Sequence, residues 1–205
     1  FLLNTRGIEM KFNHTQESGR SMVEMLGVLA IVGVLSVGGI AGYSQAMSKF
    51  KVTKAMDQVQ TIITNMRTLY ASSRTYSALT AATANSVGIL TSETYTGTGT
   101  RGINPFGGEI IFGVGSSFGT NRSFTIEYTN LTPEACVKIA TADWGADESS
   151  GLGSMWIGSN STNQHKWPSN GGGEDALTRL PVDVASAVAQ CGNTSATGII
   201  KWEYR

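Results

Sequence analysis

The longest uniform stretch of the chain is a run of 24 residues without a charged side chain, residues 25–48. An α-helix rises by about 1.5 Å per residue, so this run would measure roughly 36 Å as a helix. The hydrocarbon core of a bilayer is about 30 Å thick, whereas the apolar part of a secretory signal peptide is shorter. The run therefore predicts a membrane-spanning helix.

The helical pattern continues past this run as one apolar stripe on an otherwise polar helix. Apolar residues recur there at alternating steps of four and three: Val52, Met56, Val59, Ile63, Met66 and Tyr70. A stripe of this kind usually packs on a sheet of its own protein. We therefore expect one long N-terminal helix of about 50 residues, apolar in its first half and amphipathic in its second.

A period of two replaces the helical period in the C-terminal half of the chain. Residues 109–114 and 123–128 are bounded by turn residues and predict an antiparallel hairpin. The last residues alternate between two sets, Ile200, Trp202 and Tyr204 against Lys201, Glu203 and Arg205. This alternation predicts a strand with one face on a core and the other in water. We expect an α+β fold, with the long helix packed on a mainly antiparallel sheet in a roll.

Two short helices are expected beside the strands. The Thr-Pro-Glu motif at residues 132–134 supplies a cap, a proline in the first turn and an acid near the positive end of a helix. Residues 181–190 predict a second helix, which Gly192 ends. The connection over residues 71–104 and the glycine-rich segment that holds Trp156 are expected to be loops, with one short helical turn in the former.

Charge and composition exclude several classes of partner. The chain has 15 basic and 15 acidic residues, so its net charge is zero. The basic residues are scattered and form no stripe, and this indicates neither nucleic-acid binding nor attraction to an acidic lipid surface. We therefore expect protein partners.

Candidate catalytic and metal-binding residues are few. The only histidines are His14 and His165, so a catalytic triad would depend on His165 alone. Asp143, Asp147 and Glu148 could share a calcium ion, but a solvated acidic turn is the interpretation that we favour. We expect no catalytic residue, no metal and no cofactor, and hence no enzyme.

Cys136 and Cys191 are the only cysteines. An even pair in a chain with an export signal predicts one disulfide bond outside the reducing cytoplasm. Two buried free thiols or a metal site are the alternatives. The disulfide would place the C-terminal part of the chain in the periplasm or beyond.

One carboxylate, Glu24, lies directly before the apolar run. A helix that serves only as a membrane anchor would not be stabilised by a charge at this position. Cleavage after Gly19 would create a new ammonium group on Arg20 and would make Glu24 the fifth residue of the shortened chain. Two neighbouring copies could then pair amine with carboxylate. The fifth residues after Gly7 and Gly27 are Phe12 and Val32, so among the early glycines the match is specific to Gly19.

In this arrangement the chain resembles a type IV prepilin. Members of that family have a short polar leader that ends in glycine, a glutamate fifth after the cut and a long apolar helix. The resemblance implies that a prepilin peptidase cuts after Gly19 and N-methylates the new terminus. Arg20 departs from the Phe, Met or Leu usual at that position, so cleavage is supported more strongly than methylation. An ordinary signal anchor with a chance Gly and Glu is the alternative.

The segment from Asn104 through Cys136, with Asp143 and Trp144 beyond it, resembles the type IVb pilins in particular. The resemblance implies that the segment framed by Cys136 and Cys191 forms much of the outer face of the subunit.

We accordingly divide the chain into four parts. Residues 1–19 are the expected leader, residues 20–48 the membrane and assembly half of the helix, residues 49–72 its amphipathic half, and residues 73–205 the globular head. The chain would then carry, in this order, a processing site, a membrane anchor and an exported domain.

The function that these parts imply is that of a structural subunit of a type IV pilus. The subunit would be stored in the inner membrane with its C-terminal domain in the periplasm, and would then polymerise with copies of itself into a surface filament for adhesion, aggregation or contact with DNA or cells. Its other expected partners are the prepilin peptidase and an assembly platform in the inner membrane, with no direct nucleic-acid binding. The alternatives are a pseudopilin of a type II secretion system, a minor pilin, and a membrane-anchored periplasmic enzyme or sensor.

Overall fold

The computed structural model describes residues 18–73, 75–77, 79–91, 93–95, 101–145, 150–159, 164–167, 180–192 and 197–205, with side chains from residue 22 onward. The chain forms two compact units, Phe1–Ala46 and Met47–Arg205.

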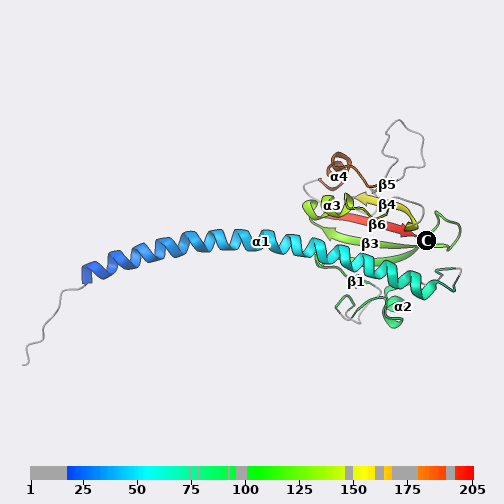
Figure 1. Cartoon of the computed structure of the whole chain (residues 1–205), viewed down its shortest axis with the longest axis horizontal. Coiled ribbons are helices and arrows are strands. Elements are labelled where there is room, and N and C mark those ends of the chain that lie inside the picture. Colours follow the sequence, from blue (N-terminus) through cyan, green and yellow to red (C-terminus); the bar gives the residue numbers. More distant parts are fainter. Residues whose placement is uncertain are drawn as a thin grey trace, which may run out of the picture. The chain divides into compact units, whose positions relative to one another are not determined.

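The first helix, α1 (Ser18–Tyr70), is 53 residues long and contributes to both units (Figure 1). A proline inside a helix removes a backbone donor and clashes with the preceding turn. The first proline of this chain is Pro105, so the whole of α1 is free of that interruption. The long N-terminal helix expected from the sequence is therefore present.

A six-stranded antiparallel sheet forms the centre of the second unit. Its strands are β1 (Gly102–Ile103), β2 (Glu109–Gly115), β3 (Ser123–Leu131), β4 (Leu152–Gly158), β5 (Gln164–Trp167) and β6 (Gly198–Tyr204). Their order in the sheet is β1-β2-β3-β6-β4-β5, so the last strand of the chain lies in the middle. The expected β2–β3 hairpin is confirmed, with Phe112 opposite Ile126.

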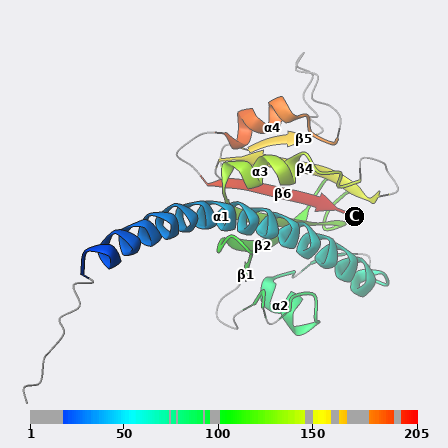
Figure 2. The ribbon, with the colours of Figure 1, turned by 60° about the vertical axis from the view of Figure 1, so that its left-hand side comes forward.

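The second part of α1 packs on this sheet (Figure 2). The predicted stripe is buried there: Val52, Val59, Ile63 and Met66 are nearly inaccessible, and Met56 and Tyr70 are half-buried against the same core. The hydroxyl of Tyr128 on β3 donates to Gln58 Oε1 at 2.6 Å. A helix on a mainly antiparallel sheet confirms the expected α+β class.

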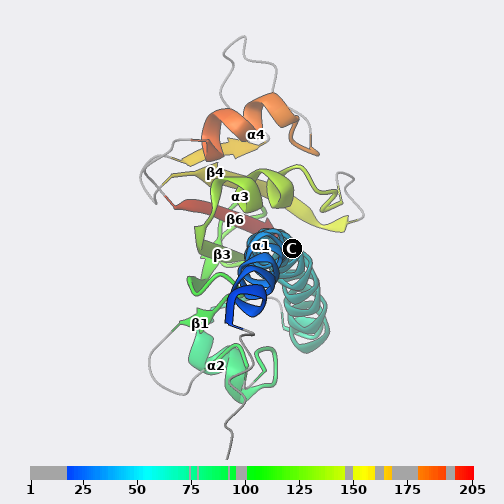
Figure 3. The same cartoon turned by 90° about the vertical axis from the view of Figure 1, so that its left-hand side faces the viewer.

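Two short helices, α3 (Pro133–Ala140) and α4 (Val184–Cys191), belong to the half of the unit that holds β4 and β5. Figures 2 and 3 show α3 on the same face of the sheet as α1. Trp144 follows α3 and packs on Trp202 of β6 with ring centroids 4.9 Å apart. A third helix, α2 (Ala81–Ser86), lies in the connection between α1 and β1.

Three expectations are wrong. The segment around Trp156 is not a loop, because it forms β4 and, with the following residues, β5. The second short helix begins at Val184 rather than at residue 181, because the side chain of Asp183 caps it by accepting from Ser186 N at 3.0 Å. The outer face of β6 is not wet throughout, because Glu203 is buried.

Candidate assembly surface

The part of α1 in the first unit presents apolar side chains to its surroundings on all sides. From Met22 to Tyr43 the exposed large side chains are Met22, Val23, Met25, Leu26, Val28, Leu29, Ile31, Val32, Val34, Leu35, Val37, Ile40 and Tyr43. The described part of the chain has one helix long and apolar enough to cross a membrane, Met22–Tyr70, with a mean hydropathy of 2.2 in its most apolar window. A continuous apolar surface of this size needs to be covered by lipid or by other protein chains.

A shallow depression interrupts this surface around Gly33. It is lined by Leu29, Ala30, Gly33, Val34 and Val37, which share one face of the helix. A Cβ atom added at Gly33 would meet nothing within 4 Å. Small residues of this kind let a second helix approach closely where both are apolar, so the depression can receive a side chain from a neighbouring helix.

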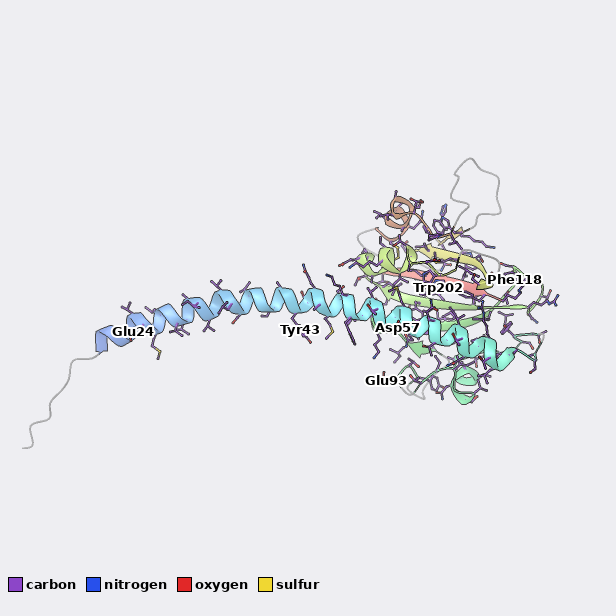
Figure 4. All side chains as sticks on the ribbon, viewed as in Figure 1. Glu24, Tyr43, Asp57, Glu93, Phe118 and Trp202 are labelled. Carbon is purple, nitrogen blue, oxygen red and sulfur yellow. A yellow bond between two sulfur atoms is a disulfide. The ribbon has the colours of Figure 1, made fainter. Side chains whose placement is uncertain are left out.

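Glu24 is the carboxylate in this apolar part of α1, and its side chain is exposed (Figure 4). Residues four positions apart in an α-helix lie one turn apart on the same face. The backbone at positions 20 and 24 is helical, so an amine at position 20 and the carboxylate of Glu24 would belong to the same face of α1. Gly19 and Arg20 lie in the first turn of the helix, and their side-chain contacts lie outside the described residues.

Cys136 on α3 and Cys191 at the end of α4 form a disulfide bond, which confirms the pairing expected from the sequence. Their Cα atoms are 5.7 Å apart, and both residues are buried. The bond frames the segment that contains β4, β5 and α4, and it joins the two short helices directly. Neither cysteine remains as a free thiol or a metal ligand.

The carboxylate of Glu203 forms a buried polar centre on the outer face of the sheet. It accepts hydrogen bonds from Ser117 N at 2.7 Å, from Ser117 Oγ at 2.6 Å, from Ser123 Oγ at 2.5 Å and from Ser154 Oγ at 3.0 Å. Burial raises the pKa of Glu203, but these hydrogen bonds together outweigh it and hold the pKa below its ordinary value. The centre fixes the β2–β3 turn over the sheet.

Of the residues considered for catalysis or metal binding, those that the structure describes do not converge. His165 is exposed on β5, with its ring centroid 5.5 Å from that of Trp167. Asp143 accepts a hydrogen bond from Gly145 N in a turn, and Asp147 and Glu148 lie outside the described residues. Within the described residues, no three His, Cys, Asp or Glu side chains gather in a group that could hold a metal ion.

Sequence comparison relates the chain to proteins of known function. The family model PilS, described as PilS N terminal, matches residues 49–201. The major structural subunit of the bundle-forming pilus of Escherichia coli O111:H- is 25% identical over 191 residues, which are 93% of this chain and 95% of the relative. The subunit of the same description from Escherichia coli O127:H6 has the same identity and coverage.

Structural comparison finds a similar fold in a solved protein. The crystal structure of a type IV b pilin from Salmonella typhi has a TM-score of 0.50 at 21% sequence identity, and the match covers 75% of this chain and 99% of that one. At this identity the likeness concerns the fold alone: a long helix packed on an antiparallel sheet.

Proposed function

Because this chain belongs to the PilS family, we propose that it is a type IVb pilin, which acts as a structural subunit of a pilus. Two relatives that it matches over nearly their whole length are described as major structural subunits of a bundle-forming pilus. A pilus subunit needs one surface that joins copies of itself and a domain that can stand outside the membrane.

The observation that carries this proposal is the exposed apolar surface of α1 in the first unit. None of the described side chains of this unit is buried. Packing within the unit therefore adds no stability to that of the helix itself. In the membrane its surface is covered by lipid, and in a filament it is covered by the same surface of other copies. One apolar helix therefore serves both for storage and for assembly.

The proposed assembly step depends on a charge pair. A prepilin peptidase cuts after Gly19, and the new amine at Arg20 of one subunit pairs with the Glu24 carboxylate of its neighbour. Between packed apolar helices the two charges are removed from water together. Removal of one partner leaves the other buried and unpaired, which costs about 3–5 kcal/mol.

The remaining partners follow from the same scheme. Before assembly the subunit is held in the inner membrane by α1, and its second unit lies in the periplasm, where the Cys136–Cys191 bond forms. An assembly platform in that membrane then extracts the subunit into a filament whose surface is formed by the second unit. Adhesion, aggregation and contact with cells are the roles that such a surface would serve.

The test is the replacement of Glu24 in native cells. Glu24→Ala and the isosteric Glu24→Gln are both expected to be cut normally, yet to reduce the mass of filaments sheared from cells by at least about tenfold, since each leaves the amine unpaired. Glu134→Ala is the matched control, because Glu134 is an exposed carboxylate on α3 in the second unit. Normal filament yield from Glu24→Gln would contradict the pairing.

A further inference from the structure

A pocket of about 410 Å³ opens where α1 ends in the second unit. It lies among the last turn of α1, the segment that follows, the β2–β3 turn and the end of β6. Its lining residues are Arg67, Tyr70, Ala71, Ser73, Tyr76, Phe118, Arg122 and Arg205. Figure 4 labels Phe118 at this end of the sheet. We call the pocket formed by these eight residues the arginine pocket.

The lining has a strong local excess of positive charge. Three of its residues are arginines and none is acidic, although the chain as a whole has equal numbers of basic and acidic residues. The ion pairs in the described part of the chain join Lys54 with Glu93, Arg101 with Glu109 and Lys138 with Glu134. Within the described residues, the three pocket arginines therefore have no carboxylate partner.

Aromatic rings orient two of the guanidinium groups. Arg67 lies over the ring of Tyr204 with its Cζ atom 5.3 Å from the centroid, and Arg205 lies over the ring of Phe118 at the same distance. Arg67 also donates to the carbonyl oxygen of Ser150, while its buried Nε atom has no hydrogen-bond partner in the structure described. Stacking orients a guanidinium group without using all its donors.

The aromatic wall of the pocket is fixed in place. The ring centroids of Tyr70 and Tyr76 are 5.0 Å apart, and Tyr76 N donates to the carbonyl oxygen of Asn121 at 2.9 Å, which ties the segment after α1 to the β2–β3 turn. Burial raises the pKa of Tyr76, and Arg67 opposes this only partly. The phenol therefore keeps its proton at neutral pH.

We propose that the arginine pocket binds an acidic saccharide, through a sulfate, phosphate or carboxylate group that the arginines hold and a sugar ring that lies against the tyrosines. Arginine matches the geometry of such oxyanions with paired N–H donors. Pockets of roughly 300–1,000 Å³ are typical of small-molecule sites, so the arginine pocket has room for a ring beside the anionic group. The inference is independent of polymerisation, because every lining residue belongs to the second unit.

The experiment is a calorimetric titration of the full chain in a neutral polyoxyethylene detergent. The probe is a heparin disaccharide that carries sulfate and carboxylate groups, and inorganic sulfate is titrated separately. Arg122→Gln is the test variant, because Arg122 lines the pocket and its side chain is exposed. Arg101→Gln is the matched control, since it removes the same charge outside the pocket.

The disaccharide is expected to bind the wild-type chain, and Arg122→Gln is expected to weaken that binding at least about tenfold, in the range of one charge-assisted hydrogen bond. Arg101→Gln should bind as the wild type does. No binding, or an equal loss in Arg101→Gln, would overturn the proposal. Equal affinity for inorganic sulfate would overturn the assignment to a saccharide. Because unassembled subunits are used, none of these results depends on filament formation.

Discussion

Glu203 shows how a single residue can depart from the pattern of its strand. Alternation along β6 predicts that Glu203 faces water with Lys201, and Glu203 does share that side of the sheet. It is nevertheless 2% exposed, because the β2–β3 turn folds over it, with Ser117 of the turn and Ser123 at the start of β3 as donors. The strand pattern contains no signal for this cover, since it depends on Ser117 in a turn 86 residues earlier in the chain.

Replacement of Glu203 with glutamine should destabilise the second unit. The amide of Glu203→Gln places a donor where Ser117 N and three hydroxyl groups now donate. We expect the free energy of unfolding to fall by about 1–3 kcal/mol at pH 7. Urea unfolding of the full chain in detergent, followed by tryptophan fluorescence, measures this change, because all four tryptophans lie in the second unit. The half-buried Glu127→Gln on the same face is the control, with a change of less than about 0.5 kcal/mol.

The stability difference between the wild type and Glu203→Gln should depend on pH. The folded state holds the pKa of Glu203 below its ordinary value, so the carboxylate contributes its stability above the pKa of the unfolded chain, about 4.3. That contribution is lost as the pH falls through the lower pKa of the folded state. The stability difference between wild type and Glu203→Gln should therefore shrink when unfolding is repeated below about pH 4. A difference that is constant with pH would show that the ionised form of Glu203 is not what stabilises the turn.

At the scale of elements, the sequence predicts most of the helices and strands. It does not predict strands whose apolar residues follow no regular period. The stripe on α1 follows a helical period, β3 and β6 follow a twofold alternation, and β2 is bounded by turn residues, so these elements are correctly expected. In β4 the inward Met155 and Ile157 flank an outward Trp156, so the run is apolar on both faces and has no alternation. Its strand character comes from pairing with β5 and β6.

The disulfide between α3 and α4 should contribute strongly to the second unit. It closes a separation of 55 residues, which in the chain-entropy model restricts the unfolded state by about 4 kcal/mol. Cys136→Ala combined with Cys191→Ala should lower the free energy of unfolding by roughly that amount, since the bond is lost together with its restriction of the unfolded chain. Urea denaturation with and without reductant measures the effect. Reductant should destabilise the wild type and leave the double variant unchanged, and an equal response of both proteins would contradict this.

At the scale of the whole molecule, the two units differ in whether their apolar side chains are buried within the unit. The second unit has a core of its own, whereas the first presents its apolar side chains outward. The assembly surface can be predicted from the sequence, because an uncharged run with one carboxylate at its start is a local pattern. The arginine pocket cannot, because Arg67, Arg122 and Arg205 are brought together only by the fold.

The central claim is that the apolar helix, freed by cleavage after Gly19, joins subunits into a filament. The most direct measurement is the intact mass of this protein in filaments sheared from its native cells and in the residual membrane. The account predicts an abundant chain in the sheared fraction that begins at Arg20 and becomes about 2 Da heavier on reduction of its disulfide. An uncut chain, or a cut chain confined to the membrane fraction, would contradict it.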